Sequence, residues 1–100
     1  MNKIIWCIDF DGTLCEEVAW TKEDATSATP RQEIIDKVNE LYNQAENIVL
    51  IYTARRDELM EESIKWLRKH GVSYHGISNN KIAADYYIDD HGITPEEFIK

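Results

Sequence analysis

The sequence predicts an α/β domain with a mostly parallel sheet, because strand-like and helix-like segments alternate along the chain. The first two strand-like segments are apolar without alternation, which is typical of strands covered on both faces. The chain has 100 residues, so we expect a single domain spanning residues 1–100. A hydrophobic fraction of 43% and a charged fraction of 30% exclude a disordered or fibrous chain.

Four segments are predicted to form strands. Residues 3–9 carry the unbroken apolar run Ile-Ile-Trp-Cys-Ile, and residues 47–53 carry the run Ile-Val-Leu-Ile-Tyr. Residues 72–77 are a weaker third candidate, and residues 86–89 are a short fourth one.

Helices are predicted between these strands from the signals at their ends. Residues 29–32 combine an N-cap threonine, a proline in the first turn and a capping-box glutamine, so a helix is expected to begin there. A second helix is expected from Asp57 to the basic residues before Gly71, with its charges placed as the helix dipole favours. Two shorter helices are expected to begin near Lys81 and at Thr94.

Residues 14–28 fit neither the helical nor the strand period. A segment of this length without regular structure is uncommon in a small domain and is often functional. We therefore interpret it as a flap-like insertion beside the end of the first strand, where Trp20 is a candidate for lining a pocket.

Charge and the length of the apolar runs exclude several classes of partner and location. Nineteen acidic and eleven basic residues give a net charge of −8, without the clustered basic face that binds nucleic acid non-specifically. No apolar run approaches the roughly 18 residues of a membrane-spanning helix. The N-terminal apolar run ends in acidic residues, unlike a secretory signal, so we expect a cytoplasmic protein with Cys7 and Cys15 reduced.

Carboxylates follow two of the predicted strands. Asp9 and Asp11 end the first strand and precede Gly12, which permits a sharp turn, and Asp89 and Asp90 end the fourth strand. Ligands of open α/β sheets bind outside the carboxyl ends of the strands, and these two strands can be neighbours. Like charges about 4 Å apart repel by roughly 4 kcal/mol at an effective dielectric near 20, and a divalent cation reverses that sign.

The donor types at these positions indicate the ion and the ligand. Oxygen ligands favour a hard cation such as Mg²⁺, and no Cys or His set accompanies the acids to favour zinc. The hydroxyl of Thr53 and the ammonium of Lys81 are suited to phosphate oxygens. Arg55 is a further candidate for contacting a substrate. An acidic nucleophile, a second acid, these two donors and a metal are the groups that phosphoryl transfer requires.

At these residues the chain resembles the haloacid dehalogenase (HAD) superfamily of phosphohydrolases. Residues 9–14 look like its first motif, Thr53 like the second, Lys81 like the third and Asp89-Asp90 like the fourth. The segments 52–55 and 81–90 look similar to small phosphatases of surface-polysaccharide gene clusters and phages, although Ile82 stands where those often have proline. The resemblance implies a three-layer, Rossmann-like domain with strand order 4-1-2-3 and no cap domain.

The resemblance also implies roles for the site residues. Asp9 attacks phosphorus and forms an aspartyl-phosphate, and Asp11 first protonates the leaving oxygen and then activates water. Thr53 and Lys81 hold the phosphoryl oxygens. The Mg²⁺ ligands are Asp9, the backbone carbonyl of Asp11 and Asp89, with Asp90 binding directly or through water.

The expected activity is hydrolysis of a phosphate monoester, with sugar phosphates or nucleotides as the first substrate guess by analogy. The expected partner is a small phosphorylated molecule, without a membrane or nucleic acid, and an open site leaves room for a homo-oligomer that completes it. Two alternatives stay open. A phospho-acceptor signalling module would need an aspartate in the second strand, and residues 48–52 contain none. A catalytically silent binding or assembly module would keep the same fold.

Overall fold

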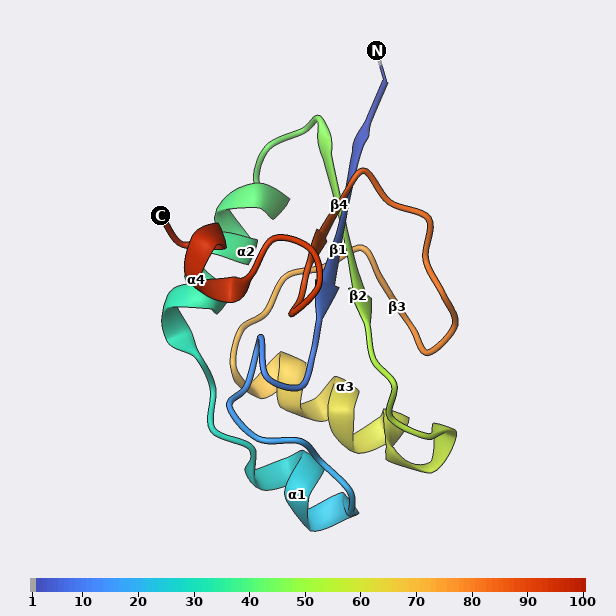
Figure 1. Ribbon diagram of the computed structural model, residues 1–100. Helices are drawn as coiled ribbons and strands as arrows, with labels where there is room; N and C mark the ends of the chain where they lie inside the picture. The colour runs from blue at the N-terminus through green and yellow to red at the C-terminus, as the bar shows by residue number, and fades with distance from the viewer. Residues whose placement is uncertain (1) are drawn as a thin grey trace.

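Strands and helices alternate through residues 2–100, the part of the chain that the computed structural model describes (Figure 1). The elements are β1 (Ile4–Asp9), α1 (Lys22–Ser27), α2 (Gln32–Tyr42), β2 (Asn47–Tyr52), a 3-10 turn η1 (Asp57–Leu59), α3 (Met60–Lys69), β3 (Gly76–Ser78), β4 (Tyr86–Ile88) and α4 (Pro95–Phe98).

The four strands form one parallel sheet in the order β3-β2-β1-β4. This is the predicted order read from the opposite edge, so the prediction is confirmed. In the central pair, Asp9 at the end of β1 lies opposite Tyr52 at the end of β2. On the other side of β1, Ile8 lies opposite Ile88 of β4. The register therefore brings Asp9 and the residues after β4 to the same edge of the sheet.

One face of the sheet carries the hydrophobic core. Alternate residues of β2 are buried, beginning with Asn47 and ending with Ile51. The same core cluster includes Ile8 of β1 and apolar residues of the helices α2, α3 and α4. Figure 1 shows α2 and α4 together on one side of the sheet. The core residues from these helices include Ile34, Ile35, Val38, Leu41, Trp66, Leu67 and Phe98.

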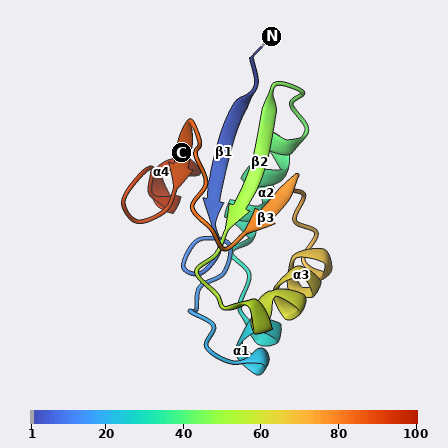
Figure 2. The same ribbon diagram turned by 90° about the vertical axis from the view of Figure 1, so that its right-hand side faces the viewer.

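The opposite face carries a loop, where the three-layer prediction expects helices. Figure 2 looks onto this face, and no helix of the described residues lies in front of β1 and β2. Parallel crossovers are right-handed, so the two that step from β1 to β2 to β3 lie on one face, and the return from β3 to β4 lies on the other. Residues 79–85 must cross three strand spacings, roughly 14 Å, to make that return.

The predicted helix near Lys81 is therefore wrong. Residues 81–84 have no regular structure, because the short return leaves no length for a helix. The Tyr87 hydroxyl accepts from the Ala84 amide at 3.0 Å and donates to the Ile82 carbonyl at 2.7 Å. These bonds satisfy loop backbone groups that a helix would otherwise pair.

The start predicted for α2 is also wrong, by two residues. The N-cap is Arg31, whose side chain makes no capping bond, and Thr29 bonds instead to the Glu17 carboxylate. Pro30 pairs with Cys15 in an isolated antiparallel bridge. That bridge holds the chain extended, so the helix begins only after it.

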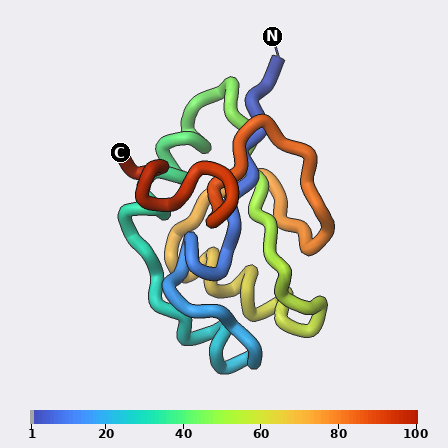
Figure 3. Tube along the Cα trace, viewed as in Figure 1, coloured from blue at the N-terminus to red at the C-terminus, as the bar shows by residue number. Residues whose placement is uncertain are grey.

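The segment 14–28 contains a helix that the sequence pattern did not predict. Thr21 and Asp24 form a reciprocal capping box at the start of α1. The segment lies at the carboxyl end of the sheet, where α1 packs against α3 (Figure 3). The Trp66 indole of α3 donates to the Ala28 carbonyl at 2.8 Å and ties the end of the segment to the core.

Other helix ends agree with the sequence. Thr94 caps α4, and Glu97 completes its capping box as the third residue of the helix. The helix expected from Asp57 begins as η1, continues as α3 and ends before Gly71, which has a φ of 68°. Within residues 2–100, no helix is long and apolar enough to cross a membrane.

Candidate functional site

A sharp turn after β1 places the two N-terminal carboxylates. Gly12 has a φ of 79°, a conformation that side chains disfavour. The Phe10 carbonyl accepts from the amides of Thr13 and Leu14 at 3.2 and 2.9 Å. The Phe10 ring is fully buried in the core. Asp9 and Asp11, on either side of this buried ring, therefore sit on a firmly held turn at the carboxyl edge of the sheet.

A pocket of about 430 Å³ lies at this edge, between the sheet and the loop 79–85. Its charged and polar walls include Asp9 of β1, Lys81 of the loop and Asp89 after β4. The other lining residues are Cys7, Tyr52, Ile82, Tyr87, His91 and Gly92. The structure thus brings together three predicted site residues from distant parts of the chain, and we call this space the Asp9 pocket.

The electrostatic environment of Asp9 is strongly negative. Burial is the main cause that raises its pKa from 3.8 to about 6, and the neighbouring carboxylates of Asp11, Asp89 and Asp90 add to the rise, while a hydrogen bond from the Phe10 amide opposes it. That bond measures 2.8 Å. Asp9 is therefore close enough to the other three acids to feel their charge, and it is mostly ionised at pH 7.

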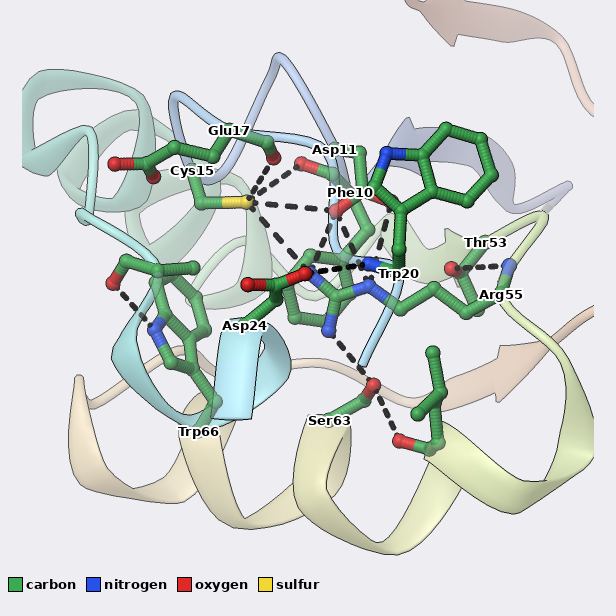
Figure 4. Close-up of polar contacts among 12 residues, drawn as sticks. Phe10, Asp11, Cys15, Glu17, Trp20, Asp24, Thr53, Arg55, Ser63 and Trp66 are labelled. Carbon is green, nitrogen blue, oxygen red and sulfur yellow. Dashed lines mark hydrogen bonds and ion pairs between the residues drawn. The ribbon is translucent and has the colours of Figure 1, made fainter. Parts of the chain in front are cut away.

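Asp11 faces a different partner. The buried guanidinium of Arg55 donates from Nη2 to Asp11 Oδ1 at 2.6 Å and from Nε to Oδ1 and Oδ2 at 3.1 and 3.3 Å (Figure 4). Its Nη1 donates to the Ser63 hydroxyl of α3 at 2.8 Å, and its guanidinium carbon Cζ lies 3.9 Å from the centre of the Phe10 ring. Arg55, predicted to contact substrate, is only 4% exposed and uses its donors on Asp11 and Ser63.

The remaining predicted residues occupy different depths. Thr53 is buried, and its hydroxyl oxygen accepts from the Arg55 amide at 3.1 Å. Lys81 and Asp90 are exposed. Asp89 Oδ1 accepts from the amides of His91 and Gly92 at 2.9 and 2.6 Å, so a turn holds this carboxylate.

A magnesium ion fits the donor chemistry of these residues, while the side chains do not form a finished ligand cage. Among residues 2–100, no group of three or more His, Cys, Asp or Glu side chains converges as a metal site. The Asp11 carboxylate is turned toward Arg55, and Asp89 bonds its own turn. The pKa of Asp9 is raised mainly by burial and in part by Asp11, Asp89 and Asp90, and a hard cation beside these acids would offset both effects.

Two tyrosines of the Asp9 pocket were missed by the sequence reasoning. Tyr52 and Tyr87 lie on the sheet face away from the core, in register with Asp9 and Cys7. The signal that could have found them is the period-two alternation counted from Asp9. The face they occupy depends on which side the helices cover, and the unbroken apolar runs concealed this.

The two cysteines are free thiols among the described residues, as expected. Burial raises the pKa of Cys7 to about 11 and that of Cys15 to about 12. Both therefore stay protonated at neutral pH and are poor nucleophiles.

A second pocket, of about 350 Å³, lies beside Asp11 rather than Asp9. It is lined by Asp11, Val18, Ala19, Trp20, Ala54, Arg55, Arg56 and Leu59. Trp20 therefore lines a pocket, and we call this space the Trp20 pocket.

Comparisons with known proteins show the fold alone. No family model matches the chain, and no curated protein gives a significant match. A chain of the Pnkp1/Rnl/Hen1 RNA repair complex is similar in structure over 98% of this chain, with a TM-score of 0.65 and 17% identity. A chain from another structure of the Pnkp1/Rnl/Hen1 complex is similar over 86%, with a TM-score of 0.63 and 18% identity. Our chain spans only 29% and 31% of the lengths of those two chains.

Proposed function

We propose that the protein is a Mg²⁺-dependent phosphatase that hydrolyses a small phosphate monoester through an aspartyl-phosphate. The observation that carries this proposal is the Asp9 pocket, where a carboxylate at the end of β1 shares one space with Lys81 and Asp89. A nucleophile, a phosphate-binding cation and a second carboxylate are the groups that this chemistry uses.

In this proposal the chain is a HAD-type hydrolase domain of the capless kind. The order of the four strands and the positions of the motif-like residues at the strand ends support that assignment. The segment 14–28 is the one insertion after the first motif, and α3 and β3 occupy the interval before Lys81. A Rossmann-like core with one open face is the architecture that results.

The first step is attack by an Asp9 carboxylate oxygen on phosphorus. A new O–P bond forms as the ester O–P bond breaks, and Asp11 gives a proton to the departing alcohol oxygen. Lys81 balances the charge on the phosphoryl oxygens, and Thr53, at the end of the neighbouring strand, donates to one of them. In the second step Asp11 takes a proton from water, whose oxygen attacks phosphorus and releases phosphate from Asp9.

The proposal assigns Mg²⁺ to Asp9, the backbone carbonyl of Asp11 and Asp89, with Asp90 as a direct or water-mediated ligand. The ion supplies positive charge that offsets the phosphate and the acid cluster. Asp9 must be ionised to attack, and a pKa near 6 leaves it mostly as carboxylate at pH 7.

A specific observation favours a second candidate function, a catalytically silent binding module on the same fold. The Asp11 carboxylate is engaged by Arg55, and no cage of three acidic side chains is formed within the described residues 2–100. A module that only binds phosphorylated ligands would tolerate both features.

A phosphatase assay over a broad panel of phosphate esters, with Mg²⁺ and with a chelator, separates the two functions. We expect Mg²⁺-dependent turnover by the wild type and a loss of at least about a thousandfold in Asp9→Asn, because the nucleophile is removed. The control is Asp36→Asn, since Asp36 is an exposed residue of α2 that bonds Gln32. Equal inactivity of wild type and Asp9→Asn on every ester would favour the binding module.

A further inference from the structure

We infer that the Trp20 pocket receives the leaving group of the substrate, and that this leaving group is an uncharged alcohol bearing a flat apolar ring. The inference rests on the proposed phosphatase and adds the class of substrate. It narrows the substrate class expected from the family resemblance, which included sugar phosphates.

The position of Asp11 connects the reaction with this pocket. Asp9 lines one pocket, while Asp11, two residues further on, lines the other. The residue that hands a proton to the leaving oxygen must lie within hydrogen-bond reach of it. A phosphoryl group on Asp9 therefore directs its ester oxygen toward Asp11 and the rest of the alcohol into the Trp20 pocket.

The walls of the Trp20 pocket are mainly apolar. Trp20 and Val18 are 75% and 52% exposed, an unusual state for large hydrophobic side chains, and Leu59 closes the pocket from η1. Figure 4 shows the Trp20 indole beside Asp11 and the Arg55 side chain. A flat indole face that is open to solvent stacks well on another ring.

Both arginines of this pocket pair with carboxylates. Arg55 donates to Asp11 and Ser63, and Arg56 pairs with Glu58 at 3.1 Å. Both cations of the lining are therefore paired with carboxylates, and the buried Arg55 uses its donors within the protein. This composition favours an uncharged ring over a polyol or an anionic group.

The chain fixes the backbone of Trp20. The Trp20 amide donates to Asp24 Oδ2 at 3.1 Å, within the capping box of α1. The base of the segment is closed by the Glu17 carboxylate, which accepts from the Thr29 amide at 2.7 Å and from its hydroxyl. Because the backbone of Trp20 is already fixed beside the N-cap of α1, stacking on its ring costs only the side-chain order of the indole.

The test compares naphthylmethyl phosphate with glycerol phosphate, both available as esters of primary alcohols, so that intrinsic leaving-group reactivity is similar. We expect the wild type to have the higher kcat/KM for naphthylmethyl phosphate. Trp20→Ala should lower the ratio of the two kcat/KM values about tenfold, the scale of one lost stacking contact, and Trp20→Phe should restore most of it.

The matched control is Tyr42→Ala, because Tyr42 is an exposed aromatic residue of α2 outside both pockets. This variant should leave the ratio unchanged. A wild type that prefers glycerol phosphate, or a ratio unaffected in Trp20→Ala, overturns the inference and leaves the phosphatase intact. Failure of the wild type to hydrolyse these two esters and the broad panel overturns both proposals.

Discussion

Arg55 shows how a charged residue can be built into the interior of a small domain. Its side chain is 1% exposed and meets a carboxylate, a serine hydroxyl and an aromatic face at the same time. A buried guanidinium is tolerated only when its donors are satisfied in this way. Arg55 therefore orients Asp11 and links the turn after β1 to α3.

Replacing Arg55 should destabilise the protein far more than replacing its neighbour. Arg55→Gln leaves Asp11 and Ser63 without their shared partner, and loss of a buried ion pair costs about 3–5 kcal/mol. Arg56 is 76% exposed in its side chain, so Arg56→Gln should change stability by less than about 0.5 kcal/mol. Urea unfolding of both variants measures the difference, and equal stabilities would show that the Arg55 contacts contribute little.

At the scale of elements, β2 is asymmetric although its sequence is uniformly apolar. Val49 and Ile51 are fully buried under the helices, while Ile48 and Leu50 are only partly buried on the other face. The unbroken run predicted a strand covered on both faces. The return loop 79–85 covers the second face less completely than a helix layer would.

Two isoleucines of this strand provide a matched test. Ile51→Ala should cost about 2–5 kcal/mol, because it opens a cavity in the core. Ile48→Ala should cost at least about 1 kcal/mol less, because its side chain keeps contact with water in the folded state. Thermal unfolding should separate the two variants by several degrees. Equal losses would mean that the second face is as well covered as the first.

At the scale of the whole molecule, the Asp9 carboxylate lowers the stability of the folded state at neutral pH. The chain carries a net charge of −8, and Asp9 is held near other acids in a half-buried position. Its pKa of about 6 lies above the ordinary 3.8, so the folded state binds the Asp9 proton more tightly than the unfolded chain does. The contribution of Asp9 to the free energy of unfolding is therefore most favourable at low pH and is lost as pH rises from about 4 to about 6.

Asp9→Asn should remove this pH dependence. Without metal, the variant should be more stable than the wild type at pH 7, and the difference should shrink as pH falls toward 4. Comparing the two proteins cancels the opposite trend of three exposed carboxylates whose pKa values are lowered by hydrogen bonds, namely Glu17, Asp24 and Glu97. Chemical unfolding across this pH range is the measurement. A wild type that is the more stable protein at pH 7 would contradict the expectation.

The sequence by itself determined β1, β2 and β4, the capped α4 and the location of Asp9 at a strand end, whereas the strand order was expected from the family resemblance and β3 lies later than predicted, at Gly76–Ser78. These elements follow from local apolar runs and capping residues, which short stretches of chain encode. The start of α2, by contrast, depended on the pairing of Pro30 with Cys15, fifteen positions earlier.

Only the tertiary structure decided which face of the sheet is covered, and which acid lines which pocket. Asp11 meets Arg55 across 44 positions of sequence, and the Asp9 pocket joins residues from both ends of the chain. Such contacts depend on the path of residues 79–85 across the sheet and on side-chain directions. Those are set by packing between distant segments, which no local pattern specifies.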